Sequence, residues 1–359
     1  MSRSVGRIAW IDTLKGMGII FVVLGHGYSS ANPKTLAYIY SFHMPLFFFL
    51  AGYVLKGDST AAFGPFFLRR LRTRIVPYIF FFLIYYAAGL IMFTQQTGLK
   101  ISSVMLMDGH EKLAAMVLAD RDVLDGMGNV ALWFLPCLFL AENIVFLVRR
   151  VAGKNRAALL AGVAVLSFIA YGESVTGYLG LHGTAVTAMT AAVFYGCGSV
   201  AGETSVNEGI FQGLRGNGVS AWLAAIAASV ALSFLNGRVD MSANYYGNYL
   251  LFYGAAFSGI LCYALTARFI SPSPWLAYFG KNSLIILCLH LSLAQAARAL
   301  YKTVFKRLFG TEYAIVHNDF YVVLIAALTL AFSIPCIYGI QTFRSAVIGK
   351  QKQQLAETP

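Results

Sequence analysis

Residues 11–26 read IDTLKGMGIIFVVLGH, an apolar run that begins with an acid and a base and ends with a histidine. With its neighbours, the run is long enough to cross the hydrocarbon core of a membrane as a helix, which takes about 20 residues. Ionisable side chains are costly in hydrocarbon, so those found within a span usually face the interior of a helix bundle and mark functional sites. The three ionisable groups of this stretch are therefore candidates for a function.

The composition of the whole chain is that of a membrane protein. Of its 359 residues, 58% are hydrophobic and only 12% are charged, whereas a soluble protein carries about 25% charged residues. The charges are clustered and leave apolar stretches of about 17–20 residues. We therefore expect an all-α, polytopic transmembrane helical bundle of about ten spans, near residues 12–28, 38–55, 75–93, 131–148, 157–171, 183–200, 219–235, 248–266, 282–300 and 320–341. The fifth span is short, and residues 172–182 either extend it or re-enter the membrane.

The basic residues predict the orientation of this bundle. With the N-terminus placed inside, cytoplasmic segments hold 17 of the 27 Lys and Arg residues, outer segments hold nine, and Lys15 lies within the first span. Because cytoplasmic loops of membrane proteins are enriched in Lys and Arg, this favours cytoplasmic N- and C-termini. An outer group of Lys302, Lys306 and Arg307 departs from the pattern. Topology also explains the net charge of +12, and no basic stripe on a soluble domain indicates a nucleic-acid partner.

The remaining segments leave no room for a separate soluble domain. We expect residues 1–345 to form a single membrane-embedded domain and residues 346–359 a polar cytoplasmic tail. The longest connection, residues 94–130, would face outward, and connections of this length often form lids or binding loops. We expect the first apolar run to be retained rather than cleaved as a signal peptide. The five cysteines lie in apolar runs and are interpreted as small core residues.

Helix geometry places the ionisable groups of the first span on one stripe. Eleven steps of about 100° separate Lys15 from His26, so they lie about 20° apart around the axis and about 16 Å apart along it. Asp12 lies one turn before Lys15, close enough to pair with it. The stripe indicates either an interior pathway or only an anchoring ion pair and an interfacial histidine, and these residues alone leave both open.

A second histidine, His43, is expected at the same membrane face as His26, because the connection between the first two spans is short. Two histidines could begin a zinc site, but no third ligand of suitable spacing accompanies them, so we expect no metal. A histidine that titrates near neutrality is suited to act as a general base.

Five stretches, in order along the chain, resemble the acyltransferase family 3 of integral membrane O-acyltransferases, especially the branch that acetylates sugars of bacterial surface polysaccharides. They are IDTLKGMGIIFVVLGH (11–26), SFHMPLFFFLAGY (41–53), FFLRRLRTRIVPY (66–78), LWFLPCLF (132–139) and YFGKNSLIILCLHLSL (278–293). The resemblance implies ten core spans, an acyl group taken from cytoplasmic acyl-CoA, and an acceptor outside. The family signature in the first span is a basic residue, usually arginine, followed after ten residues by a histidine. Here these are Lys15, which lacks the planar fork of arginine, and His26.

The resemblance also implies a donor site. Arg69, Arg70 and Arg74 match the family's basic segment before the third span, and arginine binds phosphates such as those of CoA through paired hydrogen bonds. Plain positive-inside topology is the alternative explanation of this cluster.

The candidates for substrate binding are His43, Trp133, Glu142, His290 and Asn282. Trp133 either lines the acceptor or acyl pocket or belongs to an aromatic belt. Glu142 either takes part in the reaction or, as we slightly favour, pairs with a basic residue. His290 lies mid-span and either lines a CoA tunnel or bonds a neighbouring helix. The outer turn from Asn236 to Tyr246 has a polar and aromatic mix that suits a sugar.

Together these features predict an O-acetyltransferase of the bacterial inner membrane, without a metal. It would move an acyl group, acetyl by default, from acetyl-CoA to a hydroxyl of a sugar in a surface polysaccharide or its lipid-linked precursor. His26 would be the general base, with Asp12 and Lys15 at the inner end of the pathway. A route through a covalent acyl-enzyme stays open. The alternatives are a secondary transporter of a small anionic or sugar-like substrate, although no repeat is detected, and a non-catalytic subunit of a polysaccharide assembly complex.

Overall fold

Helices account for nearly all of the regular structure in the computed structural model, which describes residues 9–28, 32–55, 62–95, 107–204, 218–309 and 319–356. Ten helical stretches are long and apolar enough to cross a membrane, which confirms the prediction of ten spans. In this part of the chain, the only β-pairing is a bridge between Asp240 and Tyr245. Helices are the expected solution, since each satisfies its own backbone hydrogen bonds in hydrocarbon.

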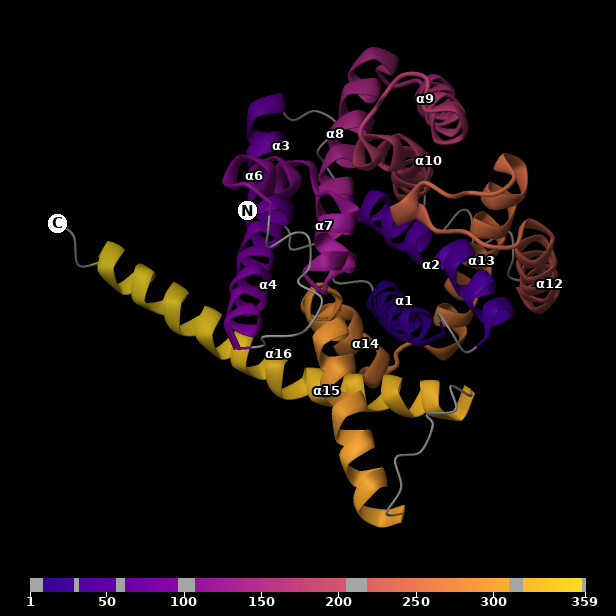
Figure 1. Cartoon of the computed structure of the whole chain (residues 1–359). Coiled ribbons are helices and arrows are strands. Elements are labelled where there is room, and N and C mark those ends of the chain that lie inside the picture. Colours follow the sequence, from indigo (N-terminus) through magenta and orange to yellow (C-terminus); the bar gives the residue numbers. More distant parts are fainter. Residues whose placement is uncertain are drawn as a thin grey trace.

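The spans are formed by the following helices (Figure 1): α1 (Ala9–Tyr28), α2 (Pro33–Tyr53), α3 (Phe63–Arg70) continued by α4 (Val76–Gln95), α8 (Phe134–Ala152), α9 (Arg156–Thr176), α10 (Gly183–Thr204), α12 (Gly218–Asn236), α13 (Tyr249–Ile270), α15 (Ser283–Phe309) and α16 (Asp319–Ala356). Helix α1 lies at the centre and contacts α2, α13, α14 (Pro274–Lys281), α15 and α16. The helix that carries His26 is therefore the one around which much of the bundle is assembled.

Three segments differ from their predicted limits. The third span begins at Phe63 rather than near residue 75, because the arginine cluster lies inside a continuous helix whose π-helical turn, Leu71–Ile75, joins α3 to α4. Helix α9 ends at Thr176, and the chain returns at Gly183, so residues 177–182 form a short connection and not a re-entrant segment. Helix α16 continues to Ala356 through most of the expected polar tail, and residues 357–359 lie outside the described residues.

The long connection between the third and fourth spans is largely helical. It contains α6 (Gly109–Leu118), α7 (Arg121–Gly126) and the 3-10 turn η3 (Val130–Trp133), while its residues 96–106 lie outside the described residues. Asp120 begins α7, where its side-chain oxygen accepts hydrogen bonds from the backbone of Asp122 and Val123 at 3.0 and 3.1 Å. Such a cap satisfies amide groups that the first turn of a helix leaves unpaired.

Glycines allow the closest helix contacts. A Cβ atom at Gly198 of α10 would lie 2.0 Å from the carbonyl oxygen of Phe49 on α2, and one at Gly52 would lie 2.0 Å from that of Tyr195. Helix α1 meets α14 in the same way, through Gly16 and Gly280. Membrane helices associate by close packing rather than by the hydrophobic effect, so such small residues set the distances between them.

We expect the replacement Gly198→Ala to destabilise the protein. The added methyl group meets backbone, which must shift, and overpacking of this kind typically costs about 1–3 kcal/mol. Thermal unfolding of the purified protein in detergent measures the effect. The control is Gly172→Ala on α9, where a Cβ would meet nothing within 4 Å. Equal melting temperatures for the two variants would contradict the packing argument.

Candidate active site

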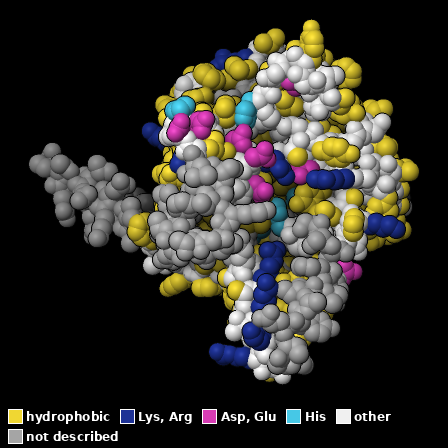
Figure 2. Space-filling view, in the orientation of Figure 1, with side chains coloured by type: hydrophobic (Ala, Val, Ile, Leu, Met, Phe, Trp, Pro, Cys, Tyr) yellow, Lys and Arg dark blue, Asp and Glu magenta, His cyan; other side chains and the backbone are white. Residues whose placement is uncertain are grey.

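A pocket of about 840 Å³ opens at the end of the bundle where α1 ends and α2 begins. We call this the pocket end. Its lining comes from α1, α2, α7, η3, one residue each of α12 and α15, and residues 237–242, and it includes His26, Tyr40, His43 and Trp133. In Figure 2, acidic and basic side chains gather on one face around a hollow in which a histidine is visible.

Three histidines from three helices meet here. The ring of His26 (α1) lies 5.0 Å from that of His290 (α15), centroid to centroid, and 6.4 Å from that of Tyr40 (α2). Tyr40 in turn lies 4.9 Å from His43. Both His43 and His290 are buried. The structure therefore brings together four residues named from the sequence, since Trp133, His26 and His43 line the pocket and His290 lies behind His26.

Backbone carbonyl groups fix the protons of two of these rings. His43 Nδ1 lies 2.8 Å from the carbonyl oxygen of Ile39, and His290 Nδ1 lies 2.9 Å from that of Leu287. A carbonyl oxygen only accepts hydrogen bonds, so Nδ1 carries the proton in each case, and Nε2 is the basic atom of the neutral ring. The Nε2 atom of His290 is buried and bonds to no other described residue. The arrangement thus offers basic nitrogen atoms at one place.

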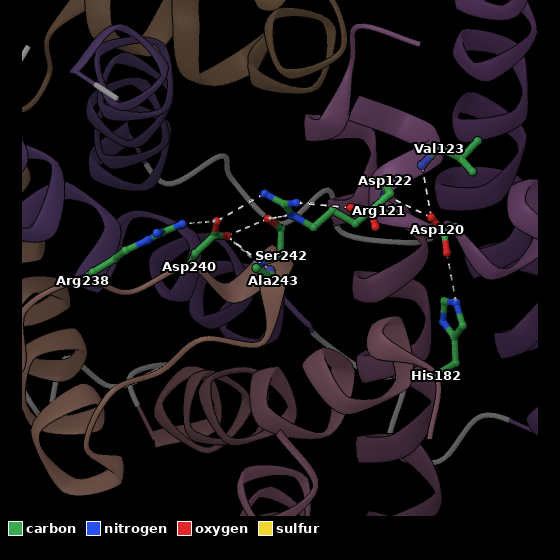
Figure 3. Close-up of polar contacts among 9 residues, drawn as sticks. All are labelled: Asp120, Arg121, Asp122, Val123, His182, Arg238, Asp240, Ser242 and Ala243. Carbon is green, nitrogen blue, oxygen red and sulfur yellow. Dashed lines mark hydrogen bonds and ion pairs between the residues drawn. The ribbon is translucent and has the colours of Figure 1, made fainter. Parts of the chain in front are cut away.

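Two segments distant in sequence, α7 and the turn at residues 238–243, meet at the rim of the pocket (Figure 3). Arg121 donates through Nε to Ser242 Oγ at 3.1 Å, and its Nη2 lies 3.5 Å from Asp240 Oδ2. Asp240 is also 4.0 Å from Arg238 Nη2. The sequence indicated the acidic connection and the polar turn separately, but not that they join. Tyr40 was also missed, although it lies three residues before His43 and hence on the same helix face.

A second polar cluster lies away from the pocket lining, around Glu142 on α8. Its carboxylate accepts from Arg74 Nη2 at 2.9 Å and Nε at 3.4 Å, and it lies 3.6 Å from Arg70 Nη1. The Glu142 side chain is fully buried, while those of Arg70 and Arg74 are 13% and 23% exposed. Of the two roles considered for Glu142, pairing with a basic residue is the arrangement seen. Arg69 is exposed on the same segment.

The other predicted site residues lie outside the pocket lining. Asp12 is buried near the start of α1, where its carbonyl oxygen packs against Gly280, and Lys15 is half-buried one turn later. Asn282 donates to the carbonyl group of Tyr278 at 2.8 Å and accepts from Gln341 at 2.6 Å, which ties the start of α15 to α16. Within the described ranges, no group of three or more His, Cys, Asp or Glu side chains is arranged to hold a metal ion.

The comparison with protein families identifies the family of this chain. A family model described as an acyltransferase domain matches residues 8–338, so the chain belongs to the acyltransferase 3 family. It is thus a membrane-bound enzyme that transfers acyl groups, and the secondary-transporter alternative is set aside. The searches of curated proteins and of solved structures found no match.

Proposed function

We propose that this protein is an O-acetyltransferase of the bacterial inner membrane that acts on sugars. It moves an acetyl group from cytoplasmic acetyl-CoA to a hydroxyl group of a surface polysaccharide or its lipid-linked precursor. The observation that best supports this proposal is the pocket in which His26 and His43 face a common space, with His290 against His26, in a chain of this family. The N- and C-termini face the cytoplasm, and the pocket end faces outward.

In the proposed reaction, His26 is the general base. It accepts the proton of the sugar hydroxyl, the hydroxyl oxygen attacks the carbonyl carbon of the thioester, and the carbon–sulfur bond breaks. The proton then passes from His26 to the departing sulfur of CoA. General base catalysis by a positioned histidine contributes about 10²–10⁴-fold to a rate. The Nε2 atom of His290, which is buried next to His26 and bonds to none of the described residues, stabilises the positive charge that His26 carries during transfer.

The remaining residues position the two substrates. Trp133 forms an apolar wall and His43 a polar one where the acceptor sugar enters. On the cytoplasmic side, Arg69, Arg70 and Arg74 attract the phosphates of CoA. Because Glu142 already pairs with Arg74 and Arg70, it orients these guanidinium groups, and the exposed Arg69 makes the first contact with the donor. Asp12, Lys15 and Asn282 hold the inner end of the pathway.

A deletion strain of the host tests this function. We expect its extracted surface polysaccharide to lack O-acetyl signals in NMR spectra, and the wild-type gene on a plasmid to restore them. The shifted ring resonances then identify the sugar and the hydroxyl group. Transfer of labelled acetyl groups from acetyl-CoA by the purified protein is the matching assay in vitro. A deletion that leaves every acyl group of the polysaccharide in place would overturn the proposal.

A further inference from the structure

The charged side chains that line the pocket are more basic than acidic. The basic ones are Lys34, Arg121 and Arg238, and the acidic ones are Asp125 and Asp240. No step of the acyl transfer described above uses these groups. A rim of this kind therefore calls for a separate explanation.

The contacts of Asp240 show that it neutralises the two neighbouring guanidinium groups only in part. Its Oδ1 atom accepts hydrogen bonds from the backbone and hydroxyl groups of Ser242, at 3.1 and 2.6 Å, and from the backbone of Ala243 at 3.3 Å. Only Oδ2 is left to face two guanidinium groups, and the distances, 3.5 Å to Arg121 and 4.0 Å to Arg238, exceed the usual 2.7–2.9 Å or so of a charge-assisted hydrogen bond. One carboxylate oxygen of Asp240 thus forms two long ion pairs, one with Arg121 and one with Arg238.

The two arginines differ in how firmly they are held. Arg121 is fixed by Ser242 and also faces Asp122 at 3.5 Å. Arg238 lies over the ring of Tyr245, 5.9 Å from its centroid, and its side chain is 73% exposed. Since both line the pocket, an entering molecule meets one guanidinium group that Ser242 positions and one that is largely exposed.

We infer that the acceptor is an anionic sugar, and that Arg238, assisted by Arg121, binds its carboxylate or phosphate group at the rim of the pocket. The inference rests on the proposed function and adds the chemical class of the acceptor. Guanidinium groups bind both anions through paired hydrogen bonds. The same contact orients the sugar so that a neighbouring hydroxyl group points inward, toward His26.

The test uses the purified full-length protein in lipid nanodiscs, with labelled acetyl-CoA. The acceptor is the host polysaccharide, stripped of O-acyl groups with base and offered either as it is or with its carboxyl groups reduced to alcohols. We expect wild type to prefer the acidic form. A hydrogen bond to a charged group contributes about 1.5–3 kcal/mol, so Arg238→Gln should raise the KM for the acidic acceptor by about 10-fold or more, with kcat little changed.

Matched variants separate a specific contact from general attraction. Arg307→Gln removes the same charge from an exposed position near the end of α15, outside the pocket lining, and should leave the KM unchanged, whereas Arg238→Lys should lie between wild type and Arg238→Gln. If reduction of carboxyl groups has no effect but removal of phosphate groups with hydrofluoric acid does, the bound anion is phosphate. Equal use of charged and neutral acceptors by wild type would overturn the inference alone. Absence of transfer to any acceptor would overturn the proposed function as well.

Discussion

Replacement of His26 by alanine is expected to lower the rate of acetyl transfer by about 10²–10⁴-fold, the usual contribution of a general base. The side chain lines the pocket and contacts two aromatic rings, those of Tyr40 and His290. No other described residue is hydrogen-bonded to its ring, so its loss should leave the bundle folded. The rate is measured with labelled acetyl-CoA and the purified protein, after size-exclusion chromatography has shown that the variant is folded.

The matched control for this variant is His110→Ala, because His110 is an exposed histidine on α6, outside the pocket lining. It should transfer acetyl groups at the wild-type rate. His26→Gln tests the chemistry further, since glutamine keeps polarity at this position but cannot take up a proton at neutral pH. A variant without His26 that keeps full activity would show that another group, such as His43, is the base.

The largest expected loss of stability follows the replacement Arg74→Gln. Among the described residues, it leaves the fully buried carboxylate of Glu142 with only the longer contact to Arg70, at 3.6 Å. Breaking a buried ion pair by removal of one partner costs about 3–5 kcal/mol, because an uncompensated charge stays in a medium of low polarity. Thermal unfolding in detergent should therefore show a clear decrease in melting temperature.

Two comparisons make this second prediction specific. Arg156 and Glu203 form an ion pair of similar composition, 3.3 Å apart, with side chains 49% and 32% exposed. Exposed pairs contribute about 1 kcal/mol or less, so Arg156→Gln should have little effect. The double variant Arg74→Gln with Glu142→Gln should regain part of the lost stability, because the buried charge is gone. If it melts no higher than Arg74→Gln alone, the carboxylate is not the cause. The KM of the double variant for acetyl-CoA then reports whether Arg74 also binds the donor.

The number of spans was predictable because hydrocarbon demands long apolar helices whatever their neighbours are. The start of the third span was not. Hydropathy excludes Arg69, Arg70 and Arg74 from a span, yet the structure places them within a continuous helix, where two of them pair with Glu142 from α8. An ion pair between helices is a tertiary contact, and a hydropathy average over consecutive residues of one helix does not reveal it.

The candidate site was predictable only in part, for the same reason. A short connection was enough to place His26 and His43 at one end of the bundle, and both line the pocket. That His290 lies against His26 depends on how α15 packs next to α1, and the contact between Arg121 and Asp240 depends on how α7 lies against the turn that holds Asp240. The sequence showed the three histidines as separate candidates and the segments of Arg121 and Asp240 only as possible binding loops, and the fold brings them together.

The close contact between Gly16 and the backbone of α14 joins the helix of His26 to a segment 264 residues further along the chain, at Gly280. A ribosome that adds about 5–20 residues per second needs roughly 10–50 s to cover that interval. The first helix therefore enters the membrane early but reaches its final neighbours late in translation. Nascent chains that have not yet passed Lys281 therefore hold the helix of His26 without the backbone contact that α14 makes with it.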